Sequence, residues 1–99
     1  MRIAVIGGMQ RLEREYLQVG QKLGIALRIF NQAGSQMRKR LGQSEALVLF
    51  TDKMSHQIRT EAMEVARTRG IPVYMLHSCG VCTLRNCLNC LKSKEVFVN

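Results

Sequence analysis

Ala46-Leu47-Val48-Leu49-Phe50 is the stretch that decides the fold of this chain. The run is short, wholly apolar and bounded by polar residues, which is typical of a strand buried inside a sheet. Three more apolar runs of this kind are spaced along the sequence, at Ile3–Ile6, Ile25–Phe30 and Val73–Leu76. Pro72 suits the first position of the last of these strands. The sequence therefore predicts four short buried strands.

Apolar residues at helical spacing occupy the segments between the strands. Two such stripes are Leu12, Tyr16, Val19 and Leu23, and Ile58, Ala62, Val65 and Ala66. A glycine follows each stripe, Gly24 and Gly70, and is expected to end the helix. A shorter helix is predicted from Ser35 to Leu41, and a last one from about Val81 to Lys92, with the stripe Leu84, Leu88 and Leu91.

The alternation of strands and helices predicts the fold class. It implies right-handed crossovers and a parallel sheet, most simply in the strand order 2-1-3-4. We therefore expect an α/β fold, Rossmann-like or flavodoxin-like, in which residues 1–99 form a single domain with a Cys-rich C-terminal helix. Four strands leave two sheet edges open, and short helices cover a small sheet poorly, so we expect a homodimer.

The bulk properties of the chain indicate where it works. No apolar run among the 99 residues approaches the length of about 20 that spans a bilayer. The first residues are typical of a strand and not of a secretion signal, so we expect a soluble, cytoplasmic protein without a membrane partner. Thiols stay reduced in that compartment, and four cysteines therefore suggest metal binding or thiol chemistry more than a disulfide framework.

The net charge of +8 is spread over both halves of the chain. Its densest run, Arg38-Lys39-Arg40, is interpreted as a solvated helix face, with a small anionic ligand as the functional alternative. Aromatic residues are not interleaved with the basic ones, and helix-turn-helix and zinc-finger spacings are missing. Nucleic acid is therefore not the expected partner, although the charge leaves it open.

The strongest motif is Cys79-x2-Cys82-x4-Cys87-x2-Cys90. Paired cysteines two residues apart suit Zn²⁺ or an iron–sulfur cluster. The gap between the pairs is short for a zinc ribbon, and a continuous helix would separate Cys79 from Cys90 by about 16 Å. Either the segment breaks near Leu84–Asn86, or the pairs serve different purposes, or pairs from two subunits meet.

Ligands of such folds sit beyond the carboxyl ends of the strands. Strands three and four are expected to be neighbours, which places His56 close to His77 and to the first cysteine pair. Cofactor-binding candidates at these strand ends are Gly7, Gly8, Arg11, Thr51, Ser55, His56 and His77. The polar residues among them fit a loop of helix caps equally well, with Ser55 as an N-cap and His56 as a surface residue.

Gly7-Gly8 does not complete a dinucleotide-binding fingerprint. The pair is interpreted as a tight turn. The functional alternative is an anion held by backbone amides at the helix start, with help from Arg11.

Further hypotheses compete for the same histidines and cysteines. Cys79 and Cys82 resemble the redox pair at a helix start in thioredoxin-like proteins, although no Trp precedes them and no Pro lies between them. Haem could use His56 or His77 as an axial ligand, whereas covalent attachment is disfavoured because no His follows the second cysteine of either pair. Buried, purely structural cysteines in a dimeric interaction module are the plainest alternative. Our leading hypothesis is a non-catalytic metal-binding protein, a redox or metal sensor.

Several short motifs together resemble one protein family. They are Ile3-Ala4-Val5-Ile6-Gly7-Gly8, Val48-Leu49-Phe50-Thr51, Ser55-His56, the helix of Ala62–Ala66, and Pro72-Val73 before His77-Ser78. The chain resembles the small bacterial domain-of-unknown-function family 2325 over nearly its whole length. The resemblance implies a Rossmann-like α/β domain without an assigned activity, with matches at His56 and His77. It does not supply the four cysteines.

Overall fold

The computed structural model describes the fold of residues 1–98 and the side chains of residues 1–52 and 54–93. Strands and α-helices alternate along the chain: β1 (Arg2–Ile6), α1 (Glu13–Lys22), β2 (Ala26–Phe30), α2 (Ser35–Leu41), β3 (Ala46–Phe50), α3 (His56–Arg69), β4 (Val73–Leu76) and α4 (Val81–Val98). Short 3-10 turns, η1 (Gln10–Leu12) and η2 (Thr51–Lys53), lead into α1 and α3. Within the described range, no helix is long and apolar enough to cross a membrane.

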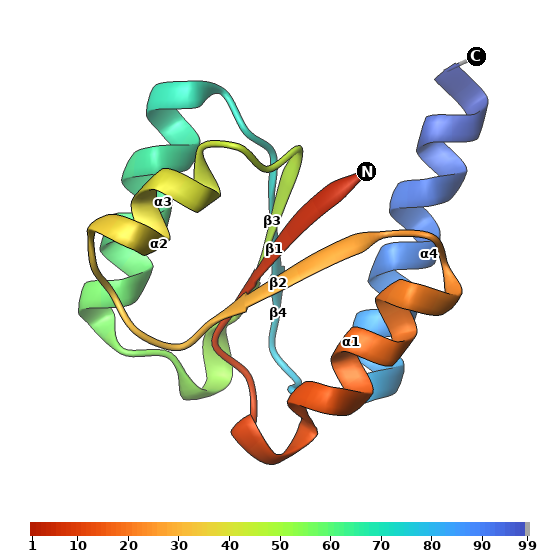
Figure 1. Cartoon of the computed structure of the whole chain (residues 1–99), viewed down its shortest axis with the longest axis horizontal. Coiled ribbons are helices and arrows are strands. Elements are labelled where there is room, and N and C mark those ends of the chain that lie inside the picture. Colours follow the sequence, from red (N-terminus) through yellow and green to blue (C-terminus); the bar gives the residue numbers. More distant parts are fainter. Residues whose placement is uncertain (99) are drawn as a thin grey trace.

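The four strands form one parallel sheet in the order β2-β1-β3-β4, which confirms the predicted fold class and strand order. Helices α1 and α4 lie on one face of the sheet, and α2 and α3 lie on the other (Figure 1). Strand β3 lies between two other strands and is covered on both faces, so all five of its residues are buried. This explains why its sequence is apolar without alternation.

Alternate side chains of the strands feed two separate cores, because successive residues of a strand point to opposite faces. Val5, Val48 and Phe50 pack against α1 and α4. Ile6 and Leu49 pack against α2 and α3. Helix α4 joins the first core through its predicted stripe of Leu84, Leu88 and Leu91.

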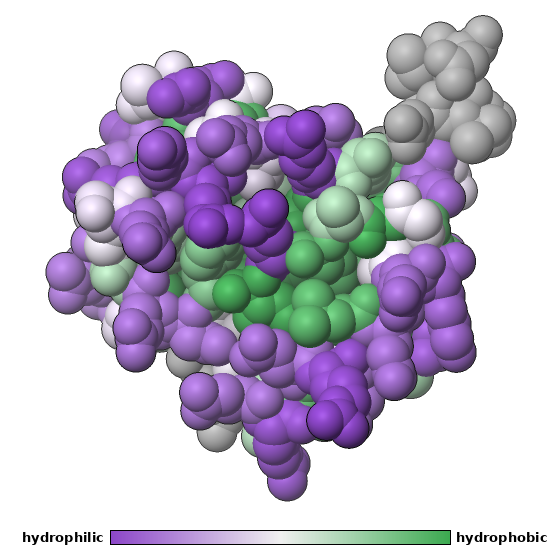
Figure 2. All heavy atoms as spheres, viewed as in Figure 1, coloured by the Kyte–Doolittle hydropathy of each residue, from purple (hydrophilic) through white to green (hydrophobic). Residues whose placement is uncertain are grey.

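Strand β2 forms one edge of the sheet and pairs only with β1. Its side chains at Leu27, Ile29 and Phe30 are half-buried, and Ala26 is exposed. Figure 2 shows a green, apolar patch over the region of β2 with purple, hydrophilic surroundings. An apolar edge strand of this kind favours self-association, and the expected homodimer stays a prediction.

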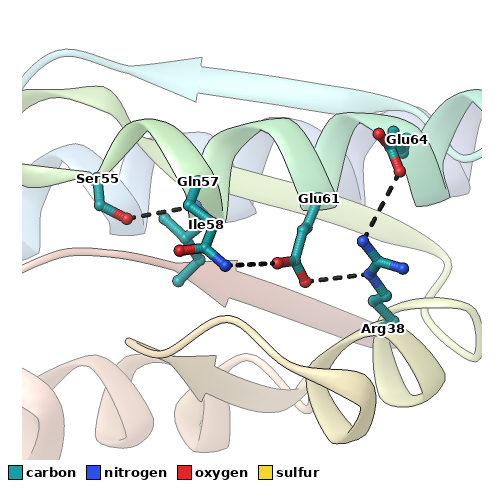
Figure 3. A network of polar contacts seen from close by, with 6 residues as sticks. All are labelled: Arg38, Ser55, Gln57, Ile58, Glu61 and Glu64. Atoms are coloured by element: carbon teal, nitrogen blue, oxygen red, sulfur yellow. Dashed lines mark hydrogen bonds and ion pairs between the residues drawn. The ribbon is translucent and has the colours of Figure 1, made fainter.

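A polar network joins α2 to α3 (Figure 3). The Glu61 carboxylate, only 9% exposed, accepts from Arg38 Nε at 3.0 Å and from Gln57 Nε2 at 3.3 Å. Ser55 caps the start of α3, since its Oγ accepts from the Ile58 amide at 3.3 Å. Arg38, the first residue of the basic run on α2, therefore serves the packing of the two helices.

We expect Glu61→Gln to lower the free energy of unfolding by about 1–2 kcal/mol, because a buried carboxylate that accepts two hydrogen bonds is replaced by an amide with one acceptor oxygen. Glu64→Gln is the matched control. Its carboxylate lies 3.8 Å from Arg38 at the exposed end of the same network and should contribute less than about 0.5 kcal/mol. Urea unfolding of both variants measures the difference, and equal losses would contradict the assignment.

Candidate functional site

The two glycines of the turn after β1 pack closely against Phe50 of β3. Gly7 and Gly8 have positive φ angles of 87° and 91°. A Cβ on Gly8 would lie 2.9 Å from the Phe50 ring, and one on Gly7 would lie 3.0 Å from the Phe50 carbonyl oxygen. Glycine is needed here both for the backbone conformation and for the close approach of β3. These contacts support the interpretation of a tight turn.

The anion alternative at this turn finds little support. Two of the amides that would face an anion already donate within the chain, from Gly7 to the Phe30 carbonyl at 2.9 Å and from Met9 to the Tyr16 hydroxyl at 3.3 Å. The Arg11 guanidinium lies 4.0 Å from the Met9 sulfur. The hypothesis of an anion bound by Gly7, Gly8 and Arg11 stays untested.

Tyr16 links the two loops at the carboxyl edge of the sheet. Its ring is fully buried and stacks on Phe50 with a centroid distance of 5.3 Å. Its hydroxyl donates to the Cys79 carbonyl at 2.5 Å and accepts from the Met9 amide. Burial raises the pKa of Tyr16 above its ordinary value of 10.0. In the sequence, Tyr16 stands out only as the one aromatic residue of the stripe Leu12, Tyr16, Val19 and Leu23. Nothing else in the sequence indicates that its hydroxyl links the two loops.

Thr51 and His77 meet where β3 and β4 end. The Thr51 hydroxyl donates to the Leu76 carbonyl at 3.3 Å and lies 3.4 Å from Nδ1 of His77. A hydroxyl has one proton, so only the Nδ1–H tautomer of His77 allows Thr51 to make both hydrogen bonds at once. The lone pair of the neutral imidazole then resides on Nε2, the arrangement that a ligating histidine needs.

His56 and Ser55 do not join this pair. Ser55 uses its Oγ as the N-cap of α3, as predicted, and His56 is an exposed residue of the first turn. Among the residues whose side chains are described, no group of three or more His, Cys, Asp or Glu could hold a metal ion. Within one chain, the structure therefore does not assemble the mixed set of two histidines and the first cysteine pair.

The four cysteines have different surroundings. Helix α4 is continuous from Val81, without the break near Leu84–Asn86 that a four-cysteine site in one chain requires. Cys79 lies before the helix and is buried in the core shared by α1 and α4. Cys82 and Cys90 are exposed free thiols. Cys87 is half-buried and packs against that core.

Helix geometry makes Cys87 and Cys90 neighbours. Residues three apart on a helix have Cβ atoms about 5–6 Å apart, close enough for both sulfurs to reach one ion. Cys82 lies five residues before Cys87, about 7.5 Å along the axis and well around the helix. Of the pair in the thiol–disulfide alternative, Cys82 is exposed and Cys79 is buried, and that alternative stays a prediction.

Comparison with known proteins gives one match. A family model described as "Uncharacterized protein conserved in bacteria (DUF2325)" matches residues 2–91, from the first strand through the last cysteine. Neither the curated proteins nor the solved structures yield a match. The family predicted from the sequence motifs is therefore confirmed.

Tyr16→Phe keeps the ring and removes the hydroxyl. We expect a loss of about 1–3 kcal/mol at pH 7, since the Cys79 carbonyl and the Met9 amide lose their shared partner. The raised pKa of Tyr16 means that its stabilising contribution is intact below pH 10 and is lost as pH rises from there through the folded-state pKa.

Urea unfolding of the wild type and of Tyr16→Phe between pH 7 and pH 11 tests this assignment. The wild type should lose stability more steeply above pH 10 than the variant. If the free energy of unfolding changes with pH in parallel for both proteins, the pKa of the Tyr16 hydroxyl is not raised by folding, and the assignment is contradicted.

Proposed function

The chain belongs to the DUF2325 family of uncharacterised bacterial proteins, and from this premise and its own residues we propose that it is a non-catalytic metal-binding protein. The ion is thiophilic, Zn²⁺ or the iron of an iron–sulfur cluster. Its ligands are Cys87 and Cys90 on α4 of two copies of the chain. The chemistry suits a metal or redox sensor, because oxidation of ligating thiolates releases the ion.

The position of Cys87 and Cys90 on α4 is the observation that carries this proposal. The two residues share one flank of the helix, displaced from the leucine stripe, with Cys90 exposed and Cys87 half-buried. Thiolates in such a pair can bind one ion at about 2.3 Å each. Full burial, the usual state of a purely structural cysteine, applies only to Cys79.

A second copy of the chain supplies the other half of the site. Structural zinc takes four ligands, and the described part of a single chain offers no group of three. A two-fold axis beside α4 would bring two pairs together as a four-cysteine site. The residues one turn earlier, Thr83 and Asn86, carry no charge.

Haem is a second candidate, favoured by the orientation of His77. Its side chain is exposed, and its contact with Thr51 leaves Nε2 as the nitrogen with the lone pair. This ligand set is separate from Cys87 and Cys90. A Soret band that disappears in His77→Ala, and persists in the cysteine variants, would support haem instead of thiolate ligation.

We expect untagged protein purified anaerobically to contain one zinc ion, or one iron–sulfur cluster, per two chains. The double variant Cys87→Ser/Cys90→Ser should lose the metal and become monomeric. Cys82→Ser, which removes an exposed thiol of the same helix, should keep both. Elemental analysis, an ultraviolet–visible spectrum and light scattering after size exclusion give the three readouts.

Two outcomes would contradict the shared site. Metal-free protein from metal-replete cells would contradict the proposed metal-binding function itself. A double variant that stays dimeric without metal would show that the dimer interface is not at Cys87 and Cys90. The apolar edge of β2 would then be the alternative interface.

A further inference from the structure

Three arginines from three different elements surround a hollow at the amino-terminal edge of the sheet. The hollow, of about 50 Å³, is called the arginine hollow here and is lined by Arg2 of β1, Arg28 of β2 and Arg40 of α2, with Ile3, Ala26, Gln43 and Ser44. It lies at the opposite edge of the sheet from the loops that hold Thr51, His77 and Cys79. No motif in the sequence brings these three arginines together.

A larger hollow of about 290 Å³ adjoins it. Its lining consists of Gln36, Lys39, Arg40 and Gln43, and two of these residues, Arg40 and Gln43, also line the arginine hollow. The two hollows thus share part of their walls, and together their linings contain four cationic side chains and two amides. Neither is lined by an aromatic side chain or by a carboxylate.

The cations of these hollows are not neutralised within the described part of the chain. The ion pairs found there join Arg38 to Glu61 and Glu64, and none involves the other two residues of the basic run. The backbone amide of Glu45 donates to the Arg2 carbonyl at 2.8 Å. Its carboxylate forms no ion pair with Arg2 and lines neither hollow.

Clustered like charges without partners raise the energy of the empty site, and a multiply charged anion relieves it. Guanidinium forks bind phosphate oxygens through paired hydrogen bonds, which gives arginine its preference for phosphate. The arginine hollow, of about 50 Å³, exceeds the volume of one water, about 30 Å³, so part of a phosphate group can enter it while the rest stays in solvent. The larger hollow is lined by two cationic side chains and two amides, which suits a second phosphate.

We propose that the two hollows form one binding site for two neighbouring phosphate groups. Arg2, Arg28 and Arg40 bind the first phosphate, and Lys39, Arg40 and Gln36 bind the second. The chemistry is that of an oligophosphate chain, which occurs free, as in tripolyphosphate, or as the backbone of a single-stranded nucleic acid. The site uses none of the cysteines and does not depend on the metal.

The test is isothermal titration of the full chain at low ionic strength with two probes, tripolyphosphate and a single-stranded oligonucleotide of twelve residues. The double variant Arg28→Gln/Arg40→Gln should weaken binding of the preferred probe at least about tenfold, since each charged hydrogen bond contributes more than about 1.4 kcal/mol. The control Arg14→Gln/Arg85→Gln removes the same charge from exposed residues of α1 and α4, on the other face of the sheet. It should change the affinity less than about twofold.

Each outcome decides between the alternatives. Tight, variant-sensitive binding of tripolyphosphate supports the site and identifies a free oligophosphate as its ligand. Binding of the oligonucleotide alone, with the same sensitivity, supports the site and assigns it to a nucleic-acid backbone. If the variant and the control lose affinity equally, the binding is unspecific attraction by the net charge and the proposal is contradicted. If neither probe binds, the proposal is overturned.

Discussion

The burial of β3 on both faces is the constraint on which the rest of the structure depends. Its five residues are buried, and their side chains enter the two cores in alternation. Each fully buried Val, Leu or Phe of this strand contributes about 1.5–3 kcal/mol through the apolar area removed from water. Both helix layers pack on this strand and on β1.

The end of β3 also organises the carboxyl edge. Phe50 stacks on Tyr16 and leaves no room for a Cβ at Gly8, and the next residue, Thr51, contacts both the end of β4 and His77. Tyr16 then ties the turn after β1 to the carbonyl of Cys79. The part of the carboxyl edge around Phe50 is thus filled by its own side chains, while two thiols of α4 are exposed.

The two proposed sites lie on different layers of the molecule. The cysteine pair belongs to α4, which covers one face of the sheet, and the phosphate site lies between α2 and the amino ends of β1 and β2 on the other (Figure 1). The residues of the basic run on α2 have different surroundings in the fold. Arg38 forms an ion pair with Glu61 of α3, whereas Lys39 and Arg40 line the hollows. One part of the run is therefore structural and the other is available to a ligand.

Much of the fold was determined by the sequence alone. Four apolar runs separated by helical stripes specify the strands, the helices, the parallel sheet and its order, because burial on both faces and right-handed crossovers leave few alternatives. Ser55 as a helix cap and the glycine turn followed from local backbone chemistry in the same way. The surroundings of the cysteines could not be predicted, since their spacing is compatible with a broken or a continuous helix. Only tertiary packing decided that Cys79 is buried while Cys82 and Cys90 are exposed. Likewise, the pairing of β1 with β2 brought Arg2 near Arg28, and the packing of α2 on the sheet added Arg40.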